Sequence, residues 1–79
     1  MNIEIDIKNQ IKKAESKFSE YNSIHEGYGI IKEEFDELWD EIKKKEPNQL
    51  KMYTEASHVA CTAIRFMKMI KQNYKGVLP

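Results

Sequence analysis

The segment IKEEFDELWDEI, residues 31–42, carries two patterns at helical spacing. On a helical wheel four acids share an arc of about 100°. These are Glu33, Glu34, Glu37 and Glu41. An apolar stripe lies directly beside that arc. It is formed by Ile31, Phe35, Leu38 and Ile42. The segment therefore predicts a helix whose apolar stripe packs in a core and whose acids lie at the edge of that core.

A second cluster follows at Glu55 and His58, which are three residues apart and share one face of a helix. The apolar stripe of this helix would pack against the first one: Ala56, Val59, Ala60, Ala63, Phe66, Met67 and Ile70. Two helices joined by a short turn would bring both clusters face to face. Carboxylates arranged in this way can hold a hard divalent cation. The alternative is that the acids are only the solvated shoulder of a bundle helix.

The chain reads as three helices within one domain, residues 1–79. We expect the first at about 3–20, although the alternation of Ile3, Ile5 and Ile7 would also suit a short strand. Ser23-Ile24-His25-Glu26 has the form of a capping box, so we expect the second helix to start after Ser23 and to end near residue 45. Pro47 breaks the chain, and Asn48 is a candidate N-cap for a third helix at about 49–73.

Gly27 and Gly29 weaken the first turns of the second helix, because each glycine costs about 0.5 to 1 kcal/mol relative to alanine. The pair indicates either a frayed helix start or the close approach of another backbone or a ligand. Both interpretations stay open from the sequence.

Composition excludes several classes of function. The 13 basic and 13 acidic residues cancel, so no overall field favours nucleic acid or an anionic membrane.

Cys61 is the single cysteine and predicts close helix packing. No signal peptide and no membrane-spanning apolar run is visible, which predicts a cytoplasmic protein. A chain of 79 residues buries only about 60 to 65% of its unfolded surface, so we expect a homo-oligomer.

The two acidic clusters carry a family resemblance. The pattern E-E-x-x-E followed by E-x-x-D is the signature of the all-α, MazG-like nucleoside triphosphate pyrophosphatases, and this chain has Glu33-Glu34-x-x-Glu37 with Glu55-x-x-His58. The segment His25–Ile31 and the run Ala63-Ile64-Arg65-Phe66 resemble short phage and prophage members. The resemblance covers about residues 24–67, and His58 stands where the family usually has aspartate.

The resemblance implies a small helical bundle completed as a dimer or tetramer. It also implies hydrolysis of a nucleoside triphosphate between the α and β phosphates, giving a nucleoside monophosphate and pyrophosphate, in nucleotide-pool control by a phage or its host. It assigns as Mg²⁺ ligands the residues Glu34, Glu37 and Glu55, with His58 at the fourth position. Because an imidazole favours transition metals, Mn²⁺ is a second candidate.

Catalytic candidates lie beside the ligand positions. Glu33 could orient or deprotonate the attacking water, and Glu41, one turn beyond Glu37, could replace it or help to hold a second ion. Trp39 is expected to pack in the core or between subunits. Two other functions stay open: a catalytically silent relative that binds a nucleotide or a protein partner, and a purely structural helical oligomer.

Overall fold

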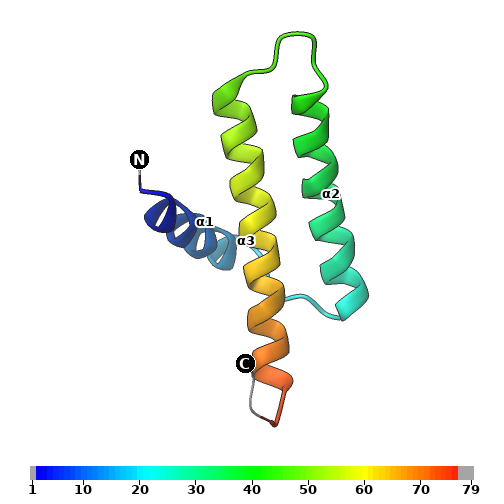
Figure 1. Cartoon of the computed structure of the whole chain (residues 1–79). Coiled ribbons are helices and arrows are strands. Elements are labelled where there is room, and N and C mark those ends of the chain that lie inside the picture. Colours follow the sequence, from blue (N-terminus) through cyan, green and yellow to red (C-terminus); the bar gives the residue numbers. More distant parts are fainter. Residues whose placement is uncertain (1, 77–79) are drawn as a thin grey trace.

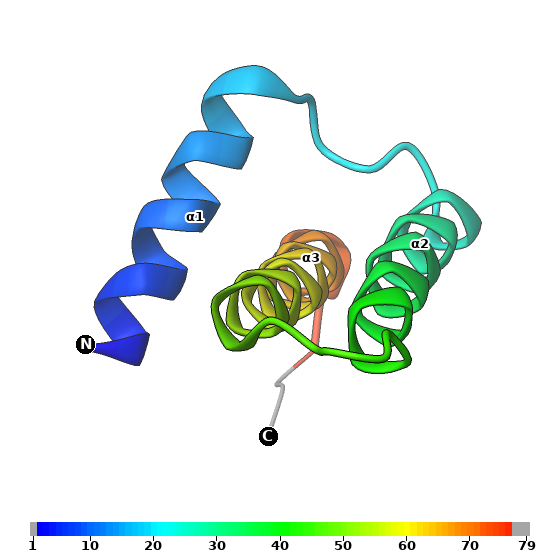
Figure 2. The same cartoon turned by 90° about the horizontal axis from the view of Figure 1, so that it is seen from above.

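The computed structural model describes residues 2–76 and contains three α-helices. They are α1 (Ile3–Lys17), α2 (Ile24–Ile42) and α3 (Gln49–Asn73). Helices α2 and α3 run antiparallel side by side, whereas α1 crosses α3 obliquely (Figure 1). Seen from above, α3 lies between the other two helices (Figure 2). The predicted all-α fold of three helices is therefore confirmed, and the described residues contain no strand.

Each helix starts at a capping side chain. Asn2, Ser23 and Asn48 have extended backbones, and each accepts a hydrogen bond from the backbone N–H three residues further on. The starts predicted at Ser23 and Asn48 are confirmed, and the strand alternative near Ile3 is excluded. In a complete capping box the Glu26 carboxylate would accept a hydrogen bond from the backbone N–H of Ser23. Here it accepts one from the backbone N–H of Asn22 instead, at 3.2 Å.

Helix α1 ends at Lys17, earlier than expected, because the chain turns to bring Tyr21 against α3. Tyr21 is 7% exposed, and its hydroxyl donates a hydrogen bond to the Thr62 carbonyl at 3.0 Å. Helix α2 also ends earlier than expected, at Ile42, and a turn leads to Pro47.

The face of α2 that packs on α3 differs from the predicted apolar stripe. Ile31 and Leu38 are half-buried, but Phe35, Trp39 and Ile42 are exposed. The buried and half-buried positions of α2 are Gly27, Ile30, Ile31, Glu34, Leu38 and Glu41. On the wheel this face is rotated by about 60° toward the acids. The assignment of Phe35 and Ile42 to the core was wrong, and so was a core position for Trp39 within one chain.

Gly27 explains this rotation. A Cβ atom at this position would lie 2.6 Å from Phe66 and 2.9 Å from Tyr21, so only glycine allows the two aromatic side chains to approach α2 here. The close approach at Gly27 comes from the side chains of Phe66 and Tyr21. At Gly29 nothing would lie within 4 Å of such a Cβ. The helix surface around Gly27 therefore faces α3 and brings Glu34 with it.

The other predicted stripes are confirmed in part. In α3, Ala56 and Met67 are exposed, while the remaining members of the stripe are half-buried. In α1, Ile7, Ile11 and Ala14 are half-buried, because the middle of α1 is the part that packs against α3. Cys61 is 5% exposed, as expected for close helix packing.

Helix α1 packs against α3 alone. The Tyr53 hydroxyl donates to the Asp6 carboxylate, and Lys68 pairs with Glu15 at 2.9 Å. Among the described residues no large side chain is fully buried, so the core of one chain is thin. None of the three described helices combines the length and the apolar character that a membrane-spanning helix needs.

Candidate metal centre

Glu34 of α2 and Glu55 and His58 of α3 converge at the middle of the helical hairpin. His58 Nδ1 lies 3.3 Å from Glu55 Oε2 and 3.6 Å from Glu34 Oε2. One ligand atom from each residue lies within 4.8 Å of the other two. All three side chains are partly shielded from water, because Glu55 is 23% exposed, Glu34 24% and His58 36%. Two helices thus hold three possible ligands on backbones that their packing fixes.

The carboxyl group of Glu34 lies in an unfavourable environment for its charge. Burial raises the pKa of Glu34, and the neighbouring Glu37 carboxylate raises it further by its charge and by a shared hydrogen bond. His58 acts in the opposite direction, lowering this pKa. Glu34 Oε2 is buried and has no hydrogen-bond donor. Buried carboxylate oxygens normally have a partner, so this oxygen is a position where a cation would be favourable.

The three residues fit a hard or borderline divalent cation. Adjacent ligand atoms around an octahedral Mg²⁺ are about 3 Å apart and opposite ones about 4 Å, given metal–oxygen distances of about 2.1 Å. The distances around His58 Nδ1 are close to the first value. Two carboxylates with one imidazole also suit Mn²⁺. In the absence of a metal the imidazole of His58 lies within 4 Å of both carboxylates, at the 3.3 and 3.6 Å given above.

The other predicted site residues lie outside this cluster. Glu37 is exposed, next to the Glu34 carboxylate. Glu33 is also exposed, further from α3 on the wheel, and lines a groove beside the cluster. Glu41 is half-buried but forms an ion pair with Lys44 at 2.8 Å, two turns from Glu34. The structure therefore brings together three of the four predicted ligands and neither of the two predicted catalytic acids.

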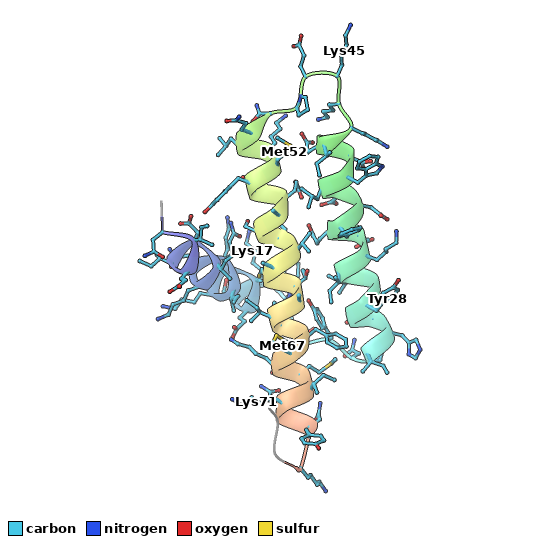
Figure 3. All side chains as sticks on the ribbon, viewed as in Figure 1. Lys17, Tyr28, Lys45, Met52, Met67 and Lys71 are labelled. Atoms are coloured by element: carbon cyan, nitrogen blue, oxygen red, sulfur yellow. The ribbon has the colours of Figure 1, made fainter. Side chains whose placement is uncertain are left out.

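The same groove contains cationic side chains that the sequence patterns did not single out. It is lined by Lys13 and Lys17 of α1 and by Arg65 of α3. The sequence also offers lysines at or beyond the ends of α2 and α3 as candidates for contact with phosphate: Lys43, Lys44, Lys45, Lys68, Lys71 and Lys75. Two of these, Lys45 and Lys71, lie toward opposite ends of the α2–α3 hairpin (Figure 3). In the sequence, the feature that could have identified Lys13 and Lys17 is their i, i+4 spacing, which places the pair beside the apolar stripe of α1.

Comparison of the chain with protein-family models, with curated proteins and with solved structures finds no match. The resemblance to MazG-like proteins therefore depends on the motif residues themselves.

Proposed function

We propose that the chain is a metal-dependent nucleoside triphosphate pyrophosphohydrolase of the MazG-like type, acting in nucleotide-pool control. The observation that carries this proposal is the convergence of Glu34, Glu55 and His58, three of the four positions that the family motif assigns to the metal. The orphaned oxygen of Glu34 supports it independently of the motif.

Glu34, Glu55 and His58 would hold Mg²⁺ or Mn²⁺, with Glu37 at the edge of the site. The ion would neutralise phosphate charge and make a bound water more acidic. Glu33, on the wall of the neighbouring groove, would accept a proton from the attacking water. The water oxygen would form a bond to the α phosphorus while the phosphoanhydride bond between the α and β phosphates breaks, so that a nucleoside monophosphate forms and pyrophosphate leaves. Glu41 has no part in this proposal, because its ion pair with Lys44 directs it elsewhere.

The test is an assay for pyrophosphate release with a panel of canonical and modified nucleotides, each with Mg²⁺ and with Mn²⁺. We expect release from at least one nucleotide and loss of release in Glu34→Gln and Glu55→Gln. Asp36→Asn is a matched control, because Asp36 is an exposed acid of α2 that pairs with Lys32. Full activity in Glu34→Gln, or no release from any nucleotide with either metal, contradicts the proposal.

The second candidate is a catalytically silent module that binds a nucleotide or a protein partner through the same bundle. His58 at the position of the family aspartate favours it, as does Glu37 lying outside the cluster. Binding of a metal-nucleotide complex without cleavage would support this candidate over the hydrolase.

We also propose that two copies of the chain pair through an apolar stripe on α2. This stripe is formed by Ile24, Tyr28, Phe35, Trp39 and Ile42, which are 44% to 65% exposed. These residues fall within about 60° on the helical wheel and form one continuous face. A thin core and a long apolar face are typical of a protomer that packs against another copy. The proposal fits the dimer or tetramer that the resemblance implies.

A further inference from the structure

A groove of about 720 Å³ runs between α1 and α2, and residues of α3 form its floor. It exists because α1 packs on α3 and makes no contact with α2. Its two sides differ in charge. The α2 side carries Glu33 and Glu34, whereas Lys13 and Lys17 lie on the α1 side. The metal candidates Glu34 and His58 line the groove, so the groove and the cluster are continuous.

Among the residues that the structure describes, the cations of this groove have no acidic partner. Within residues 2–76, no ion pair involves Lys13, Lys17 or Arg65. Arg65 is held in place by other contacts, because it donates to the Ser19 carbonyl at 3.0 Å and lies 4.9 Å above the Tyr21 ring. These contacts do not neutralise the guanidinium, so its positive charge stays at the groove and the side chain need not move to meet an anion. Both lysines are exposed and have long side chains that reach into the open space.

A ligand that matches both sides needs a cation against the carboxylates and several anionic oxygens against the lysines. A linear polyphosphate with a bound divalent ion has this character, because the ion neutralises only part of its charge. An acidic peptide matches the lysines but is repelled by Glu33 and Glu34. A free cation matches the carboxylates but leaves the lysines without a role.

We infer that this groove binds the polyphosphate chain of a metal-bound nucleotide, and that Lys13 and Lys17 contact its phosphate oxygens opposite the Glu34, Glu55 and His58 cluster. The inference deepens the proposed function and rests on it for the identity of the ligand as a nucleotide. It assigns α1 a role in binding that the carboxylate motif does not contain. The helix would supply positive charge from the open side of the bundle.

The test uses inorganic tripolyphosphate, which has the phosphate chain but no base or sugar. The preformed manganese complex is titrated into the protein by calorimetry. We expect Lys13→Gln with Lys17→Gln to weaken binding by about 10- to 100-fold, because two charge-assisted hydrogen bonds are lost. The affinity for Mn²⁺ alone should stay within about twofold, since neither lysine touches the metal cluster. Circular dichroism checks that helix content is unchanged.

The matched control is Lys8→Gln with Lys12→Gln. These lysines lie on the same helix at the same spacing, and they line a separate hollow beside Ile7 and Ile64. The control makes the same change in net charge, so it should keep tripolyphosphate affinity within about twofold. Equal weakening in both double variants would show a general charge effect and overturn the inference. No weakening in the Lys13 and Lys17 variant, or no binding by the unaltered protein, would also overturn it.

The outcomes separate this inference from the proposed function. If manganese tripolyphosphate binds in a lysine-dependent way but no nucleotide releases pyrophosphate, the binding groove is supported and the hydrolase activity is contradicted. If pyrophosphate is released but substitution of Lys13 and Lys17 does not change tripolyphosphate binding, the hydrolase activity is supported and the role of the groove is contradicted.

Discussion

Packing places the Glu34 side chain in surroundings that are unfavourable for its negative charge. The helix face around Gly27 turns Glu34 toward α3, so its carboxylate loses water and comes close to Glu55, while Glu37 lies beside it on the same helix. The oxygen Oε2 receives no hydrogen bond in return. Such an arrangement costs stability when no cation is present, and a bound cation reverses that cost.

The first prediction follows from the raised pKa of Glu34. Because the folded pKa lies above the ordinary value of 4.5, the folded state binds this proton more tightly than the unfolded chain. The favourable contribution of protonated Glu34 is fully present below pH 4.5 and is lost as pH rises through the raised pKa. We therefore expect metal-free Glu34→Gln to melt at a higher temperature than the unaltered protein at neutral pH. The difference should disappear in acid.

Thermal unfolding followed by circular dichroism across this pH range, with a chelator present, measures the effect. The comparison variant is Asp36→Asn, which removes an exposed carboxylate from the same helix. A Glu34→Gln protein that is less stable than the unaltered protein at neutral pH would show that His58 already compensates the charge.

A second prediction concerns addition and removal of metal. At a free Mn²⁺ concentration one hundred times the dissociation constant, binding to the folded state adds about 2.7 kcal/mol of stability. For a domain of this size that corresponds to a rise in Tm of roughly 10 to 20 °C. Chelation should reverse the rise, and Glu55→Gln should largely abolish it. An equal rise in the unaltered protein and in Glu55→Gln would place the bound ion elsewhere.

At the scale of the helices, local signals predicted where each element begins. Capping by Ser23 and Asn48 involves residues only three positions apart, so sequence alone can identify it. The early end of α1 depends instead on burial of Tyr21 against Thr62, 41 residues further along the chain. No local pattern contains that contact.

The rotation of α2 also decides which acids enter the site. Glu34 lies close to the centre of the α3-facing surface, whereas Glu37 is about 70° and Glu33 about 110° away on the wheel. Spacing predicted the convergence of Glu34 with Glu55 and His58, but it could not set the rotation that leaves Glu37 at the edge. The role proposed for Lys13 and Lys17 was hidden for a related reason. Lys8 and Lys12 flank the same apolar stripe on its other side, and only tertiary packing selects between the pairs.

The two glycines of α2 supply a paired prediction. Gly27→Ala would place a Cβ 2.6 Å from Phe66, so we expect a loss of about 1 to 3 kcal/mol of stability despite the better helix propensity of alanine. Gly29→Ala meets open space and should gain about 0.5 to 1 kcal/mol. Denaturant unfolding of both variants measures the difference. Equal effects of the two substitutions would contradict the packing described for Gly27.

At the scale of the whole molecule, the three helices leave much apolar surface uncovered. The α2 apolar stripe lies away from the groove, so a second copy could cover it without closing the site. In an isologous pair the stripes of two α2 helices would contact each other and bury Phe35 and Trp39 at the centre. In such a pair Trp39 would pack between subunits, which is one of the two positions that the sequence predicts for it.

We expect Phe35→Gln with Trp39→Gln to convert the assembly to monomers and to lower Tm, because the apolar area buried between copies is lost. Sedimentation velocity over a range of protein concentrations measures the change. Leu50→Gln, an exposed apolar residue of α3 outside the stripe, should leave the assembly intact. A monomeric unaltered protein at high concentration would contradict the pairing.

The proposed function and the groove both require that Glu34, Glu55 and His58 bind one divalent ion. Pulsed electron paramagnetic resonance of the Mn²⁺-loaded protein tests it most directly, because it detects ¹⁴N nuclei bonded to manganese. We expect one manganese per chain with a nitrogen coupling that disappears in His58→Gln. Absence of bound manganese, or bound manganese whose spectrum is the same with and without His58, would contradict it.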